Sequence, residues 1–198
     1  YFVITDGKNY IPIGTAQDHK RIGEGDTGPN TGGMGAYSPS LIINNDLEEK
    51  IKRKIIEPTI KAMNSINCSF KGILYAGLMV KDGEPKLIEY NIRYGDPECQ
   101  VLMMRMKTNL YDLVNSIKNK KIYQESIIWN SKPCLTVVAA AKGYPGQYKM
   151  NTEIKNVKKV KTSNSKQLFH AGTVVKNNKI FSDGGRVLNA TCLGENLE

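Results

Sequence analysis

The chain has 198 residues, of which 40% are hydrophobic and 24% are charged, as is ordinary for a soluble globular protein that buries a core. No apolar run reaches the length of a membrane span, and no secretory signal is recognisable, so no membrane partner is expected. The formal net charge of +9 favours phosphate-bearing partners, but the lysines are spread along the chain without an RNA-binding motif, so no specific nucleic acid is expected.

The cysteines and the first residues bear on the setting of the protein. Four cysteines lie far apart without a Cys-x-x-Cys pair, and only two histidines accompany them, so a zinc site is not expected. Reduced, mostly buried thiols in a cytoplasmic protein are the prediction. Residues 1–5 already have a strand pattern without a preceding Met, which indicates a fragment or a processed piece of a longer protein.

The first predicted element is a hairpin within residues 1–13, with its turn at Asp6-Gly7. After it, residues 20–40 show no hydrophobic periodicity and contain six glycines. We expect this segment to be a long structureless loop, and such loops inside compact domains are either functional or disordered.

A helix is predicted next. Asn45 is the expected N-cap, and Glu48 follows three residues later, as in a capping box. Apolar residues then recur at helical spacing as far as Met63. Pro58 falls inside this pattern, so a kink or break is expected there.

A second hairpin is predicted from residues 72–80 and 86–92, with Asp82-Gly83 at its turn. Helical spacing resumes from Cys99 to about Lys118, and two helices parted near Thr108 fit it. A polar stretch over residues 124–133 has the composition of a linker.

The composition and patterning of the sequence change near residue 131. Short β-rich runs follow, separated by glycine-containing turns, at residues 134–142, 169–175 and 186–193. The predicted fold class is therefore α+β. The predicted domains are residues 1–130 and a small, mostly antiparallel domain over residues 131–198.

The strand at 86–92 carries an unusual polar side. Side chains two residues apart share a face of a strand, so Glu89 and Asn91 point one way, and Ile88, Tyr90 and Ile92 are expected to face the core. A carboxylate and an amide oxygen form a hard donor pair that suits Mg²⁺ shared with substrate phosphates. A merely solvated sheet face is the alternative, and it is the better explanation of any single Glu-x-Asn.

The residues after this pair extend the pattern. Arg93 continues the same side if the strand extends, and a fixed guanidinium matches a carboxylate or a phosphate. Asp96, Pro97 and Glu98 are explained as the start of a helix, with Asp96 as the N-cap and Pro97 as the first helical residue.

Two neighbouring segments have residues suited to anions. Residues 26–39 are glycine-rich, and successive backbone N–H groups in such a segment can cradle an anion, although it lacks the ending of a Walker A loop. A flexible surface loop is an equally good explanation. Residues 17–21, QDHKR, supply an amide, an imidazole and two cations for a phosphate or a carboxylate.

An ordered set of motifs resembles the phosphoribosylamine–glycine ligases, or glycinamide ribonucleotide synthetases, over nearly the whole chain. The motifs are TAQDHKRIGEGDTGPNTGGMGAYSPS, GILYAGLMV, IEYNIRYGDPECQ, AAKGYPGQY, FHAGT and GGRVL. The stretch RYGDPECQ is similar to the family's signature, with Tyr94 where Phe is usual.

The resemblance implies an ATP-grasp enzyme of purine biosynthesis that uses ATP and magnesium, or manganese, to convert glycine to glycyl phosphate. The amine of 5-phosphoribosylamine then attacks, giving glycinamide ribonucleotide, ADP and phosphate. The implied fold is the second half of an ATP-grasp domain followed by a small β-rich carboxy-terminal domain. The partners are then the three small substrates and the amino-terminal domains of the same enzyme, without which this chain is expected to be inactive.

The resemblance also implies roles for residues. Glu89 and Asn91 correspond to the family's metal-binding pair, and Arg93 to the catalytic residue that faces the carboxylate being activated. The residues implied to bind substrate or nucleotide are Gln17, His19, Lys20, Asn30, Thr31, Gly32 and Gly33.

One departure and two alternatives accompany this interpretation. Many ATP-grasp sites have another acidic ligand on the preceding strand, but the matching place here is near Gly77 and Leu78, which leaves the ligands of a second metal undefined. One alternative function is that of another ATP-grasp carboxylate–amine ligase. The other is a basic, non-enzymatic binding module, which would not need Glu89 and Asn91 on one face.

Overall fold

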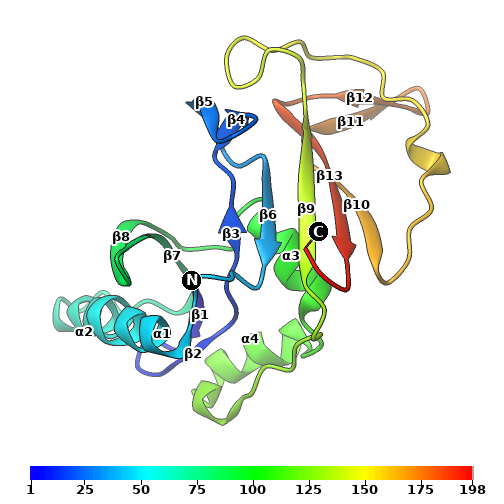
Figure 1. Cartoon of the computed structure of the whole chain (residues 1–198). Helices are drawn as coiled ribbons and strands as arrows, with labels where there is room; N and C mark the ends of the chain where they lie inside the picture. Colours follow the sequence, from blue (N-terminus) through cyan, green and yellow to red (C-terminus); the bar gives the residue numbers. More distant parts are fainter. Residues whose placement is uncertain (198) are drawn as a thin grey trace. The chain divides into compact units, whose positions relative to one another are not determined.

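The computed structural model describes residues 1–197 (Figure 1). Their contacts divide them into two compact units that are not continuous in sequence. Unit 1 comprises Tyr1–Thr15, Pro39–Gly95 and Met106–Asn130, and unit 2 comprises Ala16–Ser38, Asp96–Arg105 and Ser131–Glu198. The domain boundary expected near residue 131 stays a prediction.

Unit 1 is built on a four-stranded antiparallel sheet of order β2-β1-β7-β8. The strands are β1 (Phe2–Thr5), β2 (Tyr10–Pro12), β7 (Gly72–Lys81) and β8 (Glu84–Asn91). Both predicted hairpins are confirmed. In the second, Asp82 and Gly83 form a two-residue turn and both have positive φ, as a turn that follows the twist of the strands requires.

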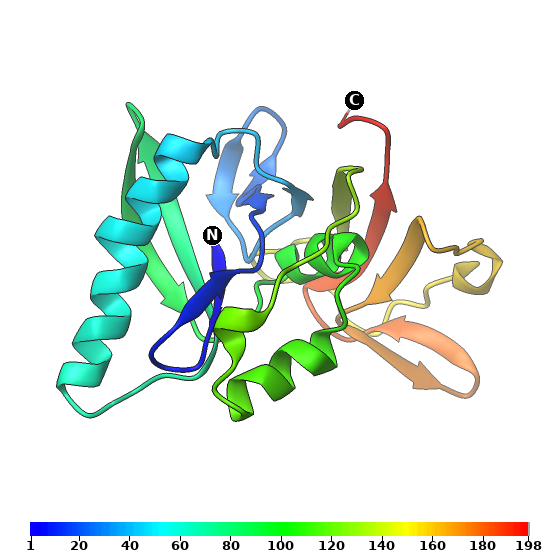
Figure 2. The ribbon, with the colours of Figure 1, turned by 90° about the horizontal axis from the view of Figure 1, so that it is seen from below.

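One helical segment of unit 1, residues 45–65, packs on this sheet. It consists of α1 (Asn45–Ile51), the π-helical segment η1 (Lys52–Ile56) and α2 (Glu57–Ser65), which run on as one rod in Figure 2. Buried Ile51, Ile56 and Ile60 form one core cluster with Val3 and Leu74 of the sheet. Burying a helical stripe against a sheet face removes apolar surface from water, which is the main stabilising contribution to such a unit.

The predicted interruption at Pro58 takes the form of a π-helical turn. The N–H of Glu57 donates to the carbonyl of Lys52, five residues earlier, in place of the usual four. Pro58 has no N–H to donate, and its ring crowds the preceding turn, so a widened turn before it accommodates both effects.

The cap of this helix lies one residue earlier than predicted. Asn44 is the N-cap, and its side chain accepts a hydrogen bond from the N–H of Leu47, so the assignment of Asn45 is wrong. Asn44 has the extended backbone that a cap needs, whereas Asn45 is already helical. Glu48 accepts a hydrogen bond from the Tyr1 hydroxyl at 2.7 Å.

Replacing the cap should have a measurable cost. Asn44→Ala is expected to lower the free energy of unfolding by about 1 kcal/mol, because the N–H of Leu47 loses its acceptor. Urea denaturation measures the change. The matched control is Asn45→Ala, expected within about 0.5 kcal/mol of the parent chain. A larger loss from Asn45→Ala than from Asn44→Ala would contradict this assignment.

Unit 2 is built on a five-stranded antiparallel sheet of order β10-β13-β9-β6-β3. Its strands are β3 (Gln17–Asp18), β6 (Gly35–Ser38), β9 (Cys134–Ala140), β10 (Lys166–His170) and β13 (Arg186–Leu193). Two ribbons accompany it, β4 (Arg21–Gly23) with β5 (Thr27–Asn30) and β11 (Thr173–Lys176) with β12 (Lys179–Ser182). The single β-rich run predicted over 169–175 is therefore divided between β10 of the five-stranded sheet and β11 of the two-stranded ribbon.

The structureless loop predicted over residues 20–40 is wrong. This segment forms β4, β5 and β6, and β6 lies inside the five-stranded sheet next to β9. Glycines hide the strand pattern because they have no side chain with which to alternate. At Gly35 the close approach is required, since a Cβ there would lie 2.7 Å from the carbonyl oxygen of Thr136.

The remaining helices are short. They are α3 (Glu98–Arg105), α4 (Leu110–Lys118), η2 (Ile122–Gln124) and η3 (Val157–Lys159). The predicted separation near Thr108 is confirmed. In unit 2, Val101 of α3 packs against Ala36 and Cys134 of the sheet. Within residues 1–197, no helix is long and apolar enough to cross a membrane.

The outer strand β8 departs from the predicted alternation. Ile88 and Ile92, expected to face the core, are 64% and 72% exposed, whereas Tyr90 does pack against the core of unit 1. The cause is a β-bulge, because the register with β7 shifts between Gly77 and Leu78 and leaves Ile88 as an extra residue. An extra residue breaks the two-residue alternation, and Ile92 lies beyond the strand end.

Candidate functional site

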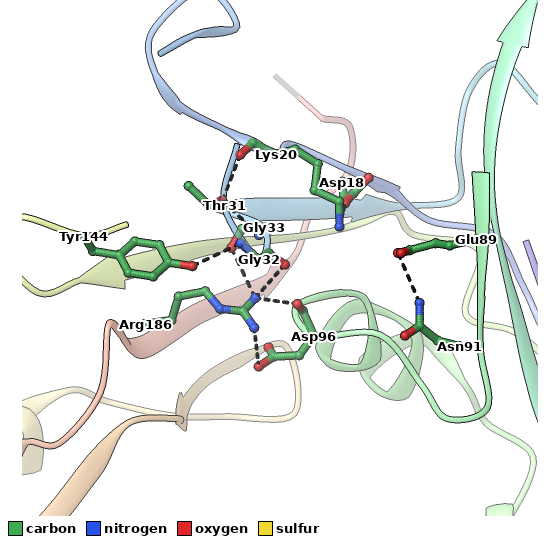
Figure 3. A network of polar contacts seen from close by, with 10 residues as sticks. All are labelled: Asp18, Lys20, Thr31, Gly32, Gly33, Glu89, Asn91, Asp96, Tyr144 and Arg186. Atoms are coloured by element: carbon green, nitrogen blue, oxygen red, sulfur yellow. Dashed lines mark hydrogen bonds and ion pairs between the residues drawn. The ribbon is translucent and has the colours of Figure 1, made fainter. Parts of the chain in front are cut away.

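Glu89 and Asn91 lie side by side at the end of β8 (Figure 3). The Asn91 side-chain amide donates to Glu89 Oε1 at 3.2 Å, so the carboxylate and the amide are together on unit 1. Gly77 stands opposite Glu89 on β7, and a Cβ at Gly77 would come within 3.1 Å of the Glu89 side chain. The missing side chain on β7 therefore leaves room for the carboxylate.

The donor set of this pair fits Mg²⁺ that is shared with a ligand. Both residues offer oxygen donors, and Glu89 is exposed, so further positions around a cation remain open to phosphate oxygens or water. No group of three or more His, Cys, Asp or Glu suited to a metal occurs within the described residues 1–197.

Arg93 does not continue the strand. β8 ends at Asn91, and the exposed guanidinium of Arg93 donates to the carbonyl of the adjacent Tyr94 at 2.8 Å. Alternation along a strand therefore does not decide which side Arg93 occupies. Its exposure leaves the guanidinium accessible to an anion.

Unit 2 holds the other predicted binding residues, beginning with those of β3. The Gln17 side chain accepts a hydrogen bond from the Tyr37 hydroxyl at 2.7 Å, and the ring of exposed His19 lies 6.0 Å from that of Tyr37. Lys20 Nζ forms an ion pair with Asp18 at 2.6 Å. Gln17 lies in β3, which pairs with β6, and His19 and Lys20 follow directly after this strand. The three side chains therefore come from one end of β3.

The predicted residues Asn30, Thr31, Gly32 and Gly33 follow one another at the end of β5 and in the turn after it. The N–H groups of this turn have acceptors inside the chain. Thr31 donates to the carbonyl of Lys20 at 2.7 Å, Gly32 donates to the Tyr144 hydroxyl at 3.0 Å, and Gly33 donates to the Thr31 hydroxyl at 3.0 Å. An anion cradle made of these N–H groups, as the glycine content suggested, is not what this turn offers.

Arg186, at the start of β13, is the centre of the polar contacts in this part of unit 2 (Figure 3). Its Nη1 donates to the carbonyl of Gly32 at 2.9 Å, to that of Gly33 at 3.3 Å, and to that of Asp96. Its Nη2 lies 3.2 Å from Asp96 Oδ2. One guanidinium thus joins β13, the turn and the segment before α3.

Asp96 has a different role from the one predicted. Its side chain accepts from Gln100 Nε2 at 2.9 Å and pairs with Arg186, and α3 begins only at Glu98. The prediction of Asp96 as an N-cap is therefore wrong. The carboxylate is instead engaged by Arg186, which comes from a distant strand, and by the side chain of Gln100.

Two of the three cysteines of unit 2, Cys99 and Cys134, are unsuited to nucleophilic chemistry. Burial, followed by the nearby charges of Asp96 and Glu98, raises the pKa of the Cys99 thiol. Burial also raises the pKa of Cys134 to about 12. Both thiols therefore stay protonated at neutral pH, and the thiolate is the reactive form.

Arg186 and Tyr144 are residues that the sequence prediction missed as parts of this site. They lie in the motifs GGRVL and AAKGYPGQY, but no local spacing links either motif to the glycine-rich segment. Their contacts with Gly32 bridge 154 and 112 residues of sequence.

Comparison with known proteins identifies the family. Residues 1–99, which are half of the chain, match the family described as "Phosphoribosylglycinamide synthetase, ATP-grasp (A) domain". The chain belongs to the phosphoribosylglycinamide synthetase family. Residues 134–198 match the C domain of the same phosphoribosylglycinamide synthetase family. The predicted α+β class, with an ATP-grasp part and a β-rich carboxy-terminal part, is confirmed.

Phosphoribosylglycinamide synthetase relatives cover the chain but are longer than it. The phosphoribosylamine–glycine ligase of Brucella melitensis is 50% identical over 191 residues, which are 96% of this chain and 45% of that protein. The crystal structure of the Thermotoga maritima phosphoribosylamine–glycine ligase matches with a TM-score of 0.85 and 32% identity, over 99% of this chain and 48% of that one. The chain thus spans a little under half the length of these phosphoribosylglycinamide synthetase relatives.

The fold extends beyond the phosphoribosylglycinamide synthetase family. The biotin carboxylase domain of the Hydrogenobacter thermophilus 2-oxoglutarate carboxylase, solved with MgADP, ADP and bicarbonate, matches with a TM-score of 0.61 over 98% of this chain and 40% of that one. At 15% identity this likeness concerns the fold alone.

Proposed function

We propose that the chain supplies part of the machinery of a phosphoribosylamine–glycine ligase. The reaction joins glycine to 5-phosphoribosylamine through glycyl phosphate and gives glycinamide ribonucleotide, ADP and phosphate. The observation that carries the proposal is the Glu89–Asn91 pair, a carboxylate that accepts a hydrogen bond from a side-chain amide on the same strand, in a chain that belongs to this family.

Glu89 and Asn91 would hold Mg²⁺, or Mn²⁺, together with the phosphates of ATP. When bound, the metal would neutralise phosphate charge, which phosphoryl transfer needs more than covalent help. The exposed Glu89 carboxylate supports this role, since a metal shared with a substrate requires an open side.

Arg93 would bind the carboxylate of glycine during its activation, and its exposed guanidinium has the fork of donors for it. Gln17, His19 and Lys20 would contact the transferred phosphate. The remaining proposed binding residues are Asn30, Thr31, Gly32 and Gly33. The N–H groups of Thr31, Gly32 and Gly33 already donate to acceptors within the chain. The turn would therefore contribute to binding through its shape and not through its backbone N–H groups.

The proposed partners are ATP, glycine, 5-phosphoribosylamine and the amino-terminal domains of the same enzyme. We also propose residues 131–198 as a carboxy-terminal domain, which the match of residues 134–198 to the family's C domain supports. A cytoplasmic location is proposed from the cysteines, all four of which are free thiols.

The test compares a full-length enzyme that carries this chain with the isolated 198 residues. The full-length enzyme should form glycinamide ribonucleotide from the three substrates in a magnesium-dependent reaction, followed by mass spectrometry. The isolated chain should form none. If the full-length enzyme consumes ATP only with a different carboxylate or amine, another ATP-grasp ligase is the correct function. Robust turnover by the isolated chain would contradict the need for further domains.

A further inference from the structure

The contacts of Arg186 extend beyond its own neighbours. The turn that it binds is joined to the main chain of Lys20 by two hydrogen bonds, since both the N–H and the hydroxyl of Thr31 donate to the Lys20 carbonyl, at 2.7 and 2.8 Å. The N–H of Met34 donates to the carbonyl of His19 at 2.8 Å. A continuous chain of contacts thus runs from Arg186 through the turn to His19 and Lys20.

The turn is shaped to receive this guanidinium. A Cβ on Gly32 would lie 2.9 Å from Arg186 Cζ, and Gly33 has φ +118°, with its absent Cβ 2.6 Å from Pro97 Cδ. The absence of side chains at these two residues therefore leaves room for Arg186 beside Gly32 and for Pro97 beside Gly33. The carbonyls of Gly32 and Gly33 both face the same Nη1 atom.

The charge of Arg186 is compensated where it lies. Its side chain is 21% exposed, and Asp96 Oδ2 supplies the opposite charge. A guanidinium can serve carbonyls through one nitrogen and a carboxylate through another because its donors are fixed in a planar fork. A lysine would offer one nitrogen for all of these oxygens.

We propose that Arg186 is a positioning residue, which holds the 31–33 turn and through it the main chain of His19 and Lys20. It thereby fixes the relative positions of the His19 and Lys20 side chains, which are proposed to contact the transferred phosphate. This inference rests on the proposed function for the role of those side chains, but the ordering of the turn is a property of the chain itself.

The experiment uses Arg186→Met and Arg186→Lys in the full-length enzyme. The matched control is Arg105→Met, because Arg105 is a buried arginine of the same unit that bonds the Ser38 hydroxyl at 2.8 Å and the Lys132 carbonyl at 3.1 Å. Turnover, KM for ATP and melting temperature are measured for all three variants. Hydrogen exchange of residues 31–34 is measured by mass spectrometry.

Arg186→Met is expected to lower kcat at least tenfold, since small displacements of positioned groups have large effects on rate. The backbone amides of residues 31–34 should exchange at least tenfold faster. Arg105→Met should keep kcat within about twofold and leave the exchange of 31–34 unchanged, while lowering the melting temperature. Arg186→Lys should recover only a minor part of the lost turnover, because it keeps the charge without the fork.

Two results would overturn the proposal. One is unchanged exchange at 31–34 in Arg186→Met, and the other is full turnover in Arg186→Met or Arg186→Lys. If the wild-type enzyme forms no glycinamide ribonucleotide, the proposed function fails, while the exchange of the turn still decides whether Arg186 orders it.

Discussion

Glu89→Gln is expected to lower the turnover of the full-length enzyme about a thousandfold, which corresponds to about 4 kcal/mol of transition-state stabilisation. The substitution keeps the shape of the side chain but removes the charge that would bind Mg²⁺. Glu89 is exposed and its hydrogen bond is to Asn91, so the melting temperature should change little. Initial rates against magnesium concentration, with thermal melts, measure both quantities.

The matched control for this variant is Glu84→Gln. Glu84 lies on the same strand and contacts Lys50 and Lys54, away from the proposed metal pair. Removing the Glu84 charge removes these surface ion pairs, which contribute little to the free energy of unfolding. The rate should stay within about twofold of wild type. Equal rates for Glu84→Gln and Glu89→Gln would show that the metal is assigned to the wrong carboxylate.

Gly33→Ala is expected to lower the free energy of unfolding by about 3 kcal/mol. Gly33 has φ +118°, which side-chain-bearing residues rarely adopt, and a Cβ there would lie 2.6 Å from Pro97 Cδ. Backbone strain and overpacking each cost about 1–3 kcal/mol. Urea denaturation of the parent and variant chains gives the difference.

Gly25→Ala is the matched control, because it measures the cost of a positive φ without a steric contact. Gly25 also has a positive φ, +64°, but nothing lies within 4 Å of the place where its Cβ would stand. Its replacement should cost about 1 kcal/mol, the strain of a left-handed residue alone. If Gly25→Ala and Gly33→Ala lose the same stability, Pro97 does not constrain the turn.

Local patterns in the sequence were sufficient for much of the fold. The hairpin with Asp82-Gly83 was predictable because this two-residue turn has positive φ at both residues, and an Asp-Gly pair adopts these angles readily. The helical segment over residues 45–65 was predictable from apolar spacing, although its cap is Asn44 and not Asn45. Neighbouring asparagines satisfy the same composition rule, and only the backbone shows which one is extended.

The placement of Glu89 and Asn91 on one strand was also predictable. Their two-residue spacing survives in β8 because the bulge lies before them, at Ile88. The same bulge defeated the prediction that Ile88 faces the core. An inserted residue changes the face of its neighbours without any mark in the sequence, because it depends on the register with the partner strand.

The amino-acid sequence by itself determined the two hairpins and the first helix of unit 1, the metal-binding hypothesis for Glu89 and Asn91, and the resemblance to its family. Only the tertiary structure decided that residues 35–38 form an inner strand, and that Arg186 joins Gly32 across 154 residues of sequence. The physical reason is that hydrophobic periodicity and turn chemistry act over a few residues. Strand neighbours and the partners of a guanidinium are selected by packing and charge between segments that the sequence keeps far apart.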